Sequence, residues 1–322
     1  MDYSVFIRRL APPVPDRYSM PMTKPKIVTA PAKINLHLAV GTPRSDGFHS
    51  IGSIFQAVSV YDRVSLEALD GGETTLECDC DCPVEKNTAW RAATAFLRVA
   101  AGRGVPEALA IAVEKGIPAG AGLGGGSSDA AATLTGLDRM FPGAVGRLEL
   151  RRIAEAIGSD VPFFMDSACA AVSGRGERLA PIAPRVDYAL VIVDPGFPIS
   201  TKAAYECLDR ARAAGRVAAA AGDEALDREL AAMVDAYERA QPSEWPFRND
   251  FFDALADEYP ALEACRADVL ASGAAFASMS GSGSAVYGVF ASSDHAERAR
   301  AALSERYQAY AAFPLARLHQ SI

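Results

Sequence analysis

A glycine-rich segment that joins an apolar strand to an alanine-rich helix constrains this chain more than any other feature. Residues 118–129 read Pro-Ala-Gly-Ala-Gly-Leu-Gly-Gly-Gly-Ser-Ser-Asp, and the stretch ALAIAVEKGIP that leads into them is typical of a strand. Glycines leave backbone N–H groups bare, so an anion can approach them, and the N-terminus of the following helix favours negative charge. The segment therefore predicts a phosphate-binding loop. Its glycines are Gly120, Gly122, Gly124, Gly125 and Gly126, and its hydroxyl donors are Ser127 and Ser128.

The details of this segment exclude two common nucleotide-binding motifs. It does not end in Gly-Lys-Ser/Thr, as a P-loop does, and no acidic residue follows a second strand where a dinucleotide fingerprint requires one. A flexible linker is the alternative, but linkers do not usually run from an apolar strand straight into a helix. Asp129, in the first helical turn, either caps the helix or reaches Mg²⁺. Capping is favoured, because Asp is frequent at helix starts.

The composition is that of a globular chain with an acidic surface. Of the 322 residues 50% are hydrophobic and 22% are charged, and the net charge is −8. We expect no nucleic-acid partner, because an acidic surface repels a polyphosphate backbone, although a few cations in a cleft can still hold a small anion. No apolar run approaches the ~20 residues of a membrane span. No signal peptide is recognised either, so we expect a cytoplasmic protein without a membrane partner.

The chain divides into a tail and two predicted domains. Residues 1–25 are rich in Pro and Met and are expected to form a flexible tail, or to result from an over-extended translation start. In the rest of the chain strands and helices interleave in both halves, which favours α/β or α+β layers. A boundary near Pro181–Asp187 separates a predicted domain at 26–181 from one at 182–322.

Hydrophobic patterns predict individual elements. Apolar residues alternate with polar ones at four positions of a predicted half-buried strand, Ile34, Leu36, Leu38 and Val40. Residues 203–239 are expected to be helical, including the alanine-rich stretch 210–222, where a low-complexity linker is the alternative.

Six cysteines are too few for a disulfide framework in a chain of this length. Cys78, Cys80 and Cys82 alternate along TTLECDCDC, and we expect them to lie on one buried strand face. A metal site is the alternative, but no second Cys or His pair follows at zinc spacing. The four histidines do not reveal a Ser-His-Asp arrangement.

Two polar positions are candidates for chemistry. Lys33 and Asn35 share one face of a predicted strand, and a lysine that points inward beside a phosphate loop can stabilise developing negative charge. His37 continues this face and is expected to be structural. Asp160 lies in the turn Gly-Ser-Asp-Val-Pro among apolar residues, where an unpaired carboxylate is unfavourable, so it either caps a helix or acts chemically.

Two further turns are possible binding elements. Asp46-Gly-Phe-His49 carries an aromatic ring and an imidazole, which would suit a nucleobase, and a partly buried turn is an equally good interpretation. Ser280-Gly-Ser-Gly-Ser284 is either a second loop of close backbone approach or an ordinary bulge.

Taken in order, these segments resemble the GHMP kinases, the superfamily of galactokinase, homoserine kinase and mevalonate kinase. Its three motifs correspond to Pro31–Asn35, Pro118–Ser128 and Ser280–Gly283. The finer resemblance is to the 4-diphosphocytidyl-2-C-methyl-D-erythritol kinase family, on Asp46–His49, the Gly-Ser-Asp-Val-Pro turn and the pair Asn249-Asp250. It covers nearly everything from Lys26 to Phe290. The tail and the lengthened alanine-rich segment depart from the family pattern.

The resemblance implies a fold and a reaction. The expected fold is α+β, with an N-terminal domain like domain 2 of ribosomal protein S5, a C-terminal ferredoxin-like α/β sandwich, and a cleft between them. The expected reaction is ATP-dependent phosphorylation of the 2-hydroxyl of 4-diphosphocytidyl-2-C-methyl-D-erythritol in non-mevalonate isoprenoid biosynthesis. ATP and Mg²⁺ are implied, with the metal ligands left open. A monomer and a homodimer are both open.

The resemblance also implies roles for individual residues. Asp160 falls on the catalytic base and Lys33 on the lysine beside it. The ATP-binding residues would be Asn87, Lys115, Pro118, Ala119, Gly120, Ala121, Gly122, Leu123, Gly124, Gly125, Gly126, Ser127 and Ser128. The acceptor would be bound by Asn35, Phe48, His49, Thr201, Tyr205, Gly281, Ser282 and Gly283. Another GHMP small-molecule kinase, of the homoserine or mevalonate type, and a non-catalytic nucleotide-binding module are the alternatives.

Overall fold

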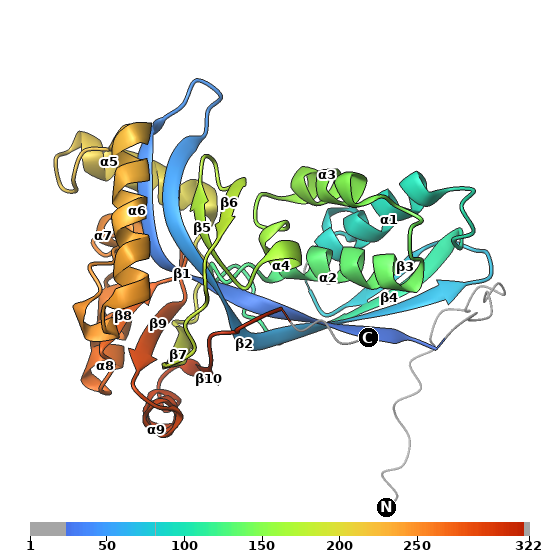
Figure 1. The fold of residues 1–322 in the computed structure, drawn as a ribbon. Helices are drawn as coiled ribbons and strands as arrows, with labels where there is room; N and C mark the ends of the chain where they lie inside the picture. The colour runs from blue at the N-terminus through green and yellow to red at the C-terminus, as the bar shows by residue number, and fades with distance from the viewer. Residues whose placement is uncertain (1–23, 81, 319–322) are drawn as a thin grey trace, which may run out of the picture.

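Two sheets organise the residues that the computed structural model describes, 24–80 and 82–318 (Figure 1). The predicted tail, 1–25, lies almost wholly outside the described residues. The first sheet closes with a strand that ends at Pro181, and the second begins with a strand at Ala189. The mixed α+β architecture predicted from the sequence is confirmed. The division into domains at residue 181 stays a prediction.

The first sheet has the strand order β3-β4-β2-β5-β6, and β1 pairs with β2 beside this path. All its pairings are antiparallel except that of β3 with β4. Helices α1–α4 lie over one face (Figure 1). The bounds are β1 Lys26–Pro43, β2 His49–Leu69, β3 Thr75–Cys78, the short helix η1 Val84–Lys86, α1 Thr88–Ala100, β4 Ala108–Glu114, α2 Gly125–Met140, α3 Arg147–Ile157, α4 Phe163–Asp166, β5 Cys169–Ser173 and β6 Arg178–Pro181.

The second sheet has the order β10-β7-β9-β8 and is antiparallel throughout. Helices α5, α7, α8 and α9 accompany it, while α6 packs against β1 and β2 of the first sheet (Figure 1). The bounds are β7 Ala189–Asp194, α5 Thr201–Ala213, α6 Asp223–Arg239, the short helix η2 Pro242–Glu244, α7 Asp250–Leu255, α8 Pro260–Ala271, β8 Phe276–Met279, β9 Val286–Phe290, α9 Ser293–Leu303 and β10 Gln308–Ala312.

Buried apolar side chains form three clusters among the described residues. One lies between the first sheet and α1–α4, one between the second sheet and its helices, and one between the two sheets. Strand β7 contributes alternate side chains to two of these clusters. Leu190 and Ile192 join the cluster between the sheets, whereas Val191 and Val193 face the helices. This packing fixes the second sheet against the first.

Strand β1 differs from the half-buried strand that its alternation predicts. Its apolar positions are buried, but so are Lys33, Asn35 and His37 on the polar face, each less than 5% exposed. Alternation indicates only that the two faces differ in polarity. Here the polar face packs against other parts of the chain, so the prediction that one face is exposed is wrong. Buried polar groups at this density must be satisfied by partners.

The alanine-rich stretch is not one helix. Helix α5 ends at Ala213 and α6 begins at Asp223, so the predicted helix through 210–222 is wrong for residues 214–222. Gly215 takes a φ of +67°, which alanine propensity does not anticipate. Among the elements that the sequence patterns did not indicate are α4 and β10. The first spans only four residues, too few for a helical period to be recognised.

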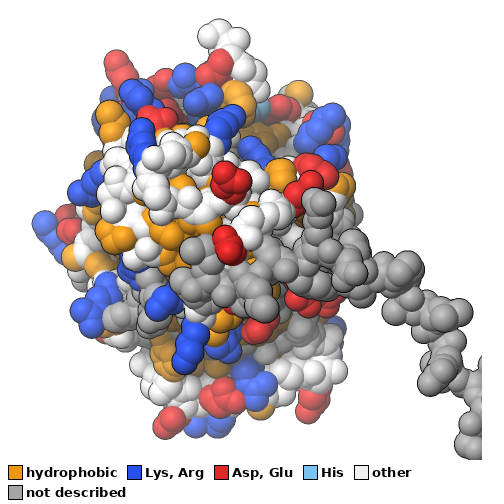
Figure 2. All heavy atoms as spheres, turned by 90° about the vertical axis from the view of Figure 1, so that its right-hand side faces the viewer, with side chains coloured by type: hydrophobic (Ala, Val, Ile, Leu, Met, Phe, Trp, Pro, Cys, Tyr) orange, Lys and Arg blue, Asp and Glu red, His pale blue; other side chains and the backbone are white. Residues whose placement is uncertain are grey.

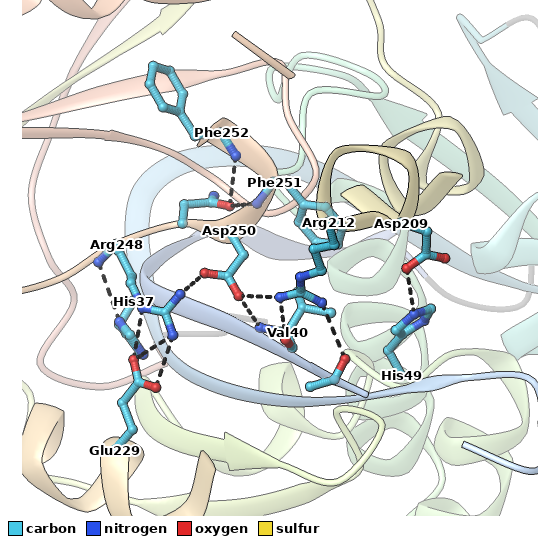
Figure 3. A network of polar contacts seen from close by, with 12 residues as sticks. His37, Val40, His49, Asp209, Arg212, Glu229, Arg248, Asp250, Phe251 and Phe252 are labelled. Carbon is cyan, nitrogen blue, oxygen red and sulfur yellow. Dashed lines mark hydrogen bonds and ion pairs between the residues drawn. The ribbon is translucent and has the colours of Figure 1, made fainter. Parts of the chain in front are cut away.

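Asp250, at the start of α7, holds the end of β1 against the helices of the second sheet (Figure 3). Its carboxylate accepts the backbone N–H of Val40 at 2.8 Å and Arg212 Nη2 at 2.9 Å, and it pairs with Arg248. Arg248 also donates to both oxygens of Glu229 on α6, at 2.9 Å each. Four charged side chains, from α5, α6, α7 and the residue before Asn249, thus hold the end of β1 in place, and other residues of β1 reach the site.

His37 is buried beside this network, and its titration should make the unfolding free energy depend on pH. Burial, with Arg248 nearby, lowers the pKa of its imidazole to about 3. Its Nε2 lies 3.5 Å from Glu229 Oε1, but Arg248 already neutralises that carboxylate. Because the unfolded chain binds this proton near pH 6.5, stability is lost as the pH falls below that value. We expect His37 to contribute a loss of about 2 kcal/mol in the unfolding free energy between pH 7 and pH 5.

Urea unfolding of the His37→Asn variant at both pH values checks this. Asn can accept the backbone N–H of Arg248 that His37 Nδ1 accepts at 3.4 Å, but it does not titrate. The variant should lose about 2 kcal/mol less than wild type between pH 7 and pH 5. His295→Asn, at the exposed start of α9, is the matched control and should keep the wild-type difference. An unchanged pH dependence in His37→Asn would contradict the assignment.

The surface carries charges of both signs. On the face that Figure 2 shows, Lys and Arg side chains are interspersed with Asp and Glu over apolar patches. In the described part of the chain, no helix combines the length and apolarity that a membrane crossing requires.

Candidate active site

The glycine-rich segment forms a tight loop between β4 and α2. Gly120, Gly122 and Gly124 all take positive φ, from +67° to +77°. Helix α2 begins at Gly125, two residues before the predicted serines, and Gly124 is its N-cap. The first backbone N–H groups of α2 therefore follow a left-handed glycine, an arrangement that leaves them free to bind an anion.

The second glycine turn packs directly on this loop. Ser280 Oγ donates to Gly122 O at 2.9 Å, and the backbone N–H of Ala285 donates to Ala121 O at 3.1 Å. A Cβ at Gly122 would lie 2.1 Å from Ser280 O, so only glycine fits there. Of the two interpretations left open by the sequence, close backbone approach is therefore confirmed over a bulge. The contact joins the phosphate loop of the first sheet to the β8–β9 turn of the second.

Lys33 lies against the same loop. Its backbone N–H donates to Leu123 O at 2.9 Å. Its side-chain stem packs against Gly124, where an added Cβ would lie 3.1 Å from Lys33 Cγ. Lys33 Nζ donates to Asn35 Oδ1 at 2.5 Å, and Asn35 Nδ2 donates to Ser53 Oγ at 2.9 Å. The expected common face of Lys33 and Asn35 is present. Burial lowers the pKa of Lys33, and the charge of Asp160 opposes that shift.

Asp160 lies in the turn between α3 and α4. This turn touches the phosphate loop, because a Cβ at Gly158 would lie 3.7 Å from Ser127 Oγ. The negative charge of Asp160 acts on two other side chains. It opposes the lowering of the Lys33 pKa by burial, and it adds to the rise that burial causes in the pKa of Tyr205 on α5. The structure thus brings together a carboxylate, an ammonium group and the glycine-rich loop from three distant parts of the chain.

A pocket of about 580 Å³ opens along the loop. Its wall includes the loop, Asn87, Thr88, Lys115 and the cysteines of the 78–82 segment. Asn87 caps α1 through its side-chain oxygen, which accepts Ala89 N at 2.9 Å. Thr88 Oγ1 donates to Gly126 O at 2.5 Å. The start of α1 is therefore fastened to the loop, and the volume is in the range of small-molecule sites.

Asp62 was missed by the sequence reasoning and binds three residues that lead from β4 into the loop. It is fully buried on β2, and its Oδ1 accepts the N–H groups of Gly116 and Ile117 at 2.7 and 2.8 Å. Its Oδ2 accepts Lys115 Nζ at 2.5 Å. A charged residue inside the apolar strand IGSIFQAVSVYDRVSLEAL was the available signal. Asp62 holds the backbone where the loop leaves β4.

Asp129 does not cap α2, so the favoured interpretation of this residue is wrong. The cap is Gly124, and Asp129 lies one turn inside the helix, where its Oδ2 accepts Lys115 Nζ at 2.7 Å. Burial raises the pKa of Asp129 to about 7, and Asp62 adds to the rise, whereas Lys115 opposes it. Two carboxylates share one ammonium group, and Asp62 has two further backbone donors. Burial of Asp129 thus favours its neutral form, whereas the Lys115 ammonium group favours its charged form.

The three neighbouring cysteines do not form a buried strand face, as the alternation predicts. Strand β3 ends at Cys78, and Cys82 is exposed at the mouth of the pocket. Cys80 Sγ and Cys82 Sγ lie 3.3 Å apart. The pairing of β3 with β4 stops at Val113, so the chain bends away before Cys80. The described residues contain no group of three or more side chains arranged to hold a metal ion.

The residues predicted for acceptor binding include a stacked pair of rings, one of which, Tyr205, is close enough to Asp160 for its charge to affect the tyrosine pKa. The rings of His49 and Tyr205 stack at 4.8 Å between centroids. Asp209 Oδ1 lies 3.2 Å from His49 Nε2, from which it can accept a hydrogen bond (Figure 3). Phe48 is 55% exposed, with the Arg175 guanidinium 5.1 Å from its ring centroid. Asp209 was not foreseen, because its partner is 160 residues away in the sequence.

The β8–β9 turn borders this region as well. Thr201 Oγ1 lies 3.2 Å from Ser282 Oγ, and Asn249 Nδ2 donates to the carbonyls of Met279 and Gly281 at 2.7 and 2.9 Å. A Cβ at Gly281 would lie 3.4 Å from Asn35 Oδ1. The turn therefore contacts both the phosphate loop and the polar face of β1.

Comparison with known proteins matches two family models to the chain. The GHMP kinases N terminal domain covers residues 87–174, and the GHMP kinases C terminal domain covers residues 230–309. Among solved structures, the fold is similar to a 4-(cytidine 5'-diphospho)-2C-methyl-D-erythritol kinase, with a TM-score of 0.74 and 33% identity over 90% of this chain and 99% of that one. A homoserine kinase from Cytophaga hutchinsonii, 17% identical with a TM-score of 0.68, covering 93% of this chain and 98% of its own, shares the fold.

Curated relatives show the same likeness. The 4-diphosphocytidyl-2-C-methyl-D-erythritol kinase of Treponema pallidum is 40% identical over 86% of this chain and 94% of its own length. That of Rhodococcus jostii is 36% identical over 87% and 89%. With its loop, its two polar turns and this identity over nearly the full length of its relatives, the chain belongs to the 4-diphosphocytidyl-2-C-methyl-D-erythritol kinase family of the GHMP kinases.

Proposed function

We propose that this chain transfers the γ-phosphoryl group of ATP to the 2-hydroxyl of 4-diphosphocytidyl-2-C-methyl-D-erythritol, in isoprenoid precursor biosynthesis. Its relatives carry the name of this activity. The observation that carries the proposal is the meeting of the phosphate loop with Lys33 and the Asp160 turn. Phosphoryl transfer depends mainly on positioning and charge stabilisation, which such a site supplies.

ATP would occupy the pocket along the loop. The backbone of Pro118–Ser128 would bind the phosphates, and Asn87 and Lys115 would border the adenosine portion. Lys115 is held by Asp62 and Asp129, so it would act as a fixed wall of the pocket rather than as a mobile phosphate ligand. The loop supplies donors without side chains, and this allows the triphosphate to lie close to the backbone.

Mg²⁺ would accompany ATP, and two buried atoms beside the loop fit it. Ser128 Oγ and Asp129 Oδ1 lack a hydrogen-bond partner among the described residues. Mg²⁺ prefers oxygen ligands and usually takes only one or two from the protein, with phosphates and water completing the octahedron. Ser128 and Asp129 would hold it, and the metal would neutralise charge on the phosphates when bound.

The chemical step would use Asp160 and Lys33. Asp160 would accept the proton of the acceptor hydroxyl, or orient that hydroxyl, as the new bond to phosphorus forms. Lys33 would stabilise both this carboxylate and the charge on the transferring group. Burial lowers the pKa of Lys33, and Asp160 opposes this shift, so the carboxylate favours the charged ammonium that the step requires.

The acceptor would lie across Asp160 from ATP. Its cytosine would contact Phe48, His49 and Tyr205, and its erythritol portion would contact Asn35. Thr201 and the turn residues Gly281, Ser282 and Gly283 would border its phosphates. The stacked pair of His49 and Tyr205 offers an aromatic platform with a polar edge, which suits a nucleobase.

His49→Ala should therefore affect one substrate only. Loss of the ring removes a stacking partner and a hydrogen-bonding edge, so the KM for the cytidylyl substrate should rise by about 10- to 100-fold while the KM for ATP stays within about twofold. Steady-state kinetics with each substrate varied in turn give both values. His295→Ala, far along the chain on α9, is the control. Equal rises in both KM values would refute the assignment of His49.

A substrate panel separates the proposal from its alternatives. ADP release should be fast with the cytidylyl substrate and at background with homoserine or mevalonate. Preference for either of these would indicate another GHMP kinase activity. ATP binding without ADP release in any mixture would indicate a nucleotide-binding module.

A further inference from the structure

Three free thiols cluster at the mouth of the pocket proposed for ATP. Cys78, Cys80 and Cys82 all line it, and the cysteines elsewhere in the described chain, at positions 169, 207 and 265, are buried. Cys80 Sγ and Cys82 Sγ are in contact at 3.3 Å. The chain bends at residues 79 and 80, so residues two positions apart lie closer together here than they would in an extended strand. Two thiols this close, one of them exposed, are placed for oxidation.

The environment distinguishes the three sulfurs. Hydrogen bonds from Cys78, then from Cys82 and Asn87, lower the pKa of Cys80, whereas burial raises the pKa of Cys78 to about 12. The hydrogen bond to Cys80 raises the pKa of Cys82. A thiolate is the nucleophile in thiol oxidation, so Cys80 is the sulfur that reacts first. Cys82, in contact with it and exposed, is the sulfur that resolves the product.

We propose that Cys80 and Cys82 form a reversible disulfide in response to peroxide, and that this bond weakens ATP binding. The Cys80 thiolate attacks one peroxide oxygen, the O–O bond breaks, and hydroxide leaves, giving a sulfenic acid. The Cys82 sulfur then attacks Cys80 Sγ, the S–O bond breaks, and water leaves. Two thiols lose two electrons and two protons in total, and one peroxide is reduced to two waters. The effect on ATP rests on the proposed function, whereas the bond itself does not.

Asn87 connects the cysteines to the pocket. Its Nδ2 donates to Cys80 Sγ at 3.6 Å and lies 3.9 Å from Cys82 Sγ, while its Oδ1 caps α1. A disulfide draws the two sulfurs from 3.3 Å to about 2 Å and removes the thiolate acceptor. The Asn87 amide and the segment that carries Cys82 must shift with them. Both line the pocket, so the ATP-bound geometry loses a contact.

Mass spectrometry after peroxide treatment tests the bond. The intact wild-type protein should lose two hydrogens, and peptide mapping should join Cys80 to Cys82. In Cys82→Ser, dimedone should trap a sulfenic acid at Cys80, and Cys80→Ser should give neither product. Cys78→Ser is the matched control, two residues away in the same cluster, and should still form the bond. An unchanged mass, a bond through Cys78, or preferential reaction of the buried cysteines would overturn the proposal.

Calorimetric titration with ATP tests the consequence, within each variant, as the ratio of Kd after and before oxidation. In wild type and in Cys78→Ser, oxidation should raise the Kd for ATP about three- to tenfold, which corresponds to the loss of one hydrogen bond. Dithiothreitol should restore the Kd of the reduced protein. In Cys80→Ser the ratio should stay at one. A Cys80–Cys82 bond that leaves the Kd unchanged would overturn the coupling to ATP. If reduced enzyme binds ATP but never releases ADP, the kinase proposal fails and the disulfide result still stands.

Discussion

Asp160→Asn should lower kcat by about 10²–10⁴ while the Kd for ATP stays close to the wild-type value. Asparagine keeps the shape of the turn between α3 and α4 but cannot accept the acceptor proton. The contacts that hold the loop in place, from the Lys33 backbone N–H to Leu123 O and from Ser280 Oγ to Gly122 O, do not involve residue 160. Single-turnover ADP release and calorimetric ATP binding measure the two quantities.

The same variant has a second signature. The Asp160 charge raises the pKa of Lys33, so its removal lowers that pKa further. Lys33 must be protonated to stabilise the transferring group, and the alkaline limb of the residual pH–rate profile should therefore move to lower pH. Asp166→Asn is the control. Asp166, at the end of α4, pairs with Arg151 on α3, and its replacement should keep both the rate and the pH–rate profile. Near-normal turnover in Asp160→Asn would remove this residue from its proposed role.

Gly122→Ala adds a single methyl group, and we expect it to lower activity more than any other glycine-to-alanine change in the site. The added Cβ would lie 2.1 Å from Ser280 O and 3.2 Å from Gly283 N, at a φ of +77°. The phosphate loop and the β8–β9 turn must then separate. A displacement of about 1 Å in a positioned site costs on the order of 10²-fold in rate, so kcat/KM for ATP should fall by at least about 10².

Gly143→Ala separates close approach from backbone strain. Gly143 takes a φ of +78°, almost the same as Gly122, but no described atom lies within 4 Å of its Cβ position. It should lose about 1–2 kcal/mol of unfolding free energy through left-handed strain and keep its activity. Urea unfolding and steady-state kinetics of both variants give the comparison. If Gly122→Ala remains as active as Gly143→Ala, the contact between the two loops is not needed for catalysis.

The sequence predicts the loops of this site better than it predicts their surroundings. Glycine spacing, Lys33 and the Asp160 turn are recognisable because each is local: a few adjacent residue types determine the backbone path. The loop lies where the strand-to-helix pattern puts it, with a start of α2 two residues earlier than the serines suggest. The resemblance to the family added the roles of these residues, which spacing alone does not supply.

Contacts distant in sequence account for the features that were missed or wrong. Asp62 supports the loop from 54 and 55 residues away, and nothing near it in the sequence indicates its partners. Asp129 was expected to cap a helix because of its position, but Lys115 and burial outweigh that local preference. Cys80 leaves strand β3 because its pairing with β4 ends, although the alternation continues. In each case tertiary packing overrode a local pattern.

Transfer of label from [γ-³²P]ATP tests the central claim most directly. Incubation of the full-length enzyme with Mg²⁺ and 4-diphosphocytidyl-2-C-methyl-D-erythritol should place one labelled phosphoryl group on each acceptor molecule, in equal amount to the ADP formed. Without the acceptor, no labelled organic product should form. Label found only in inorganic phosphate, or left in ATP after complete mixing with acceptor, would contradict the proposed kinase activity.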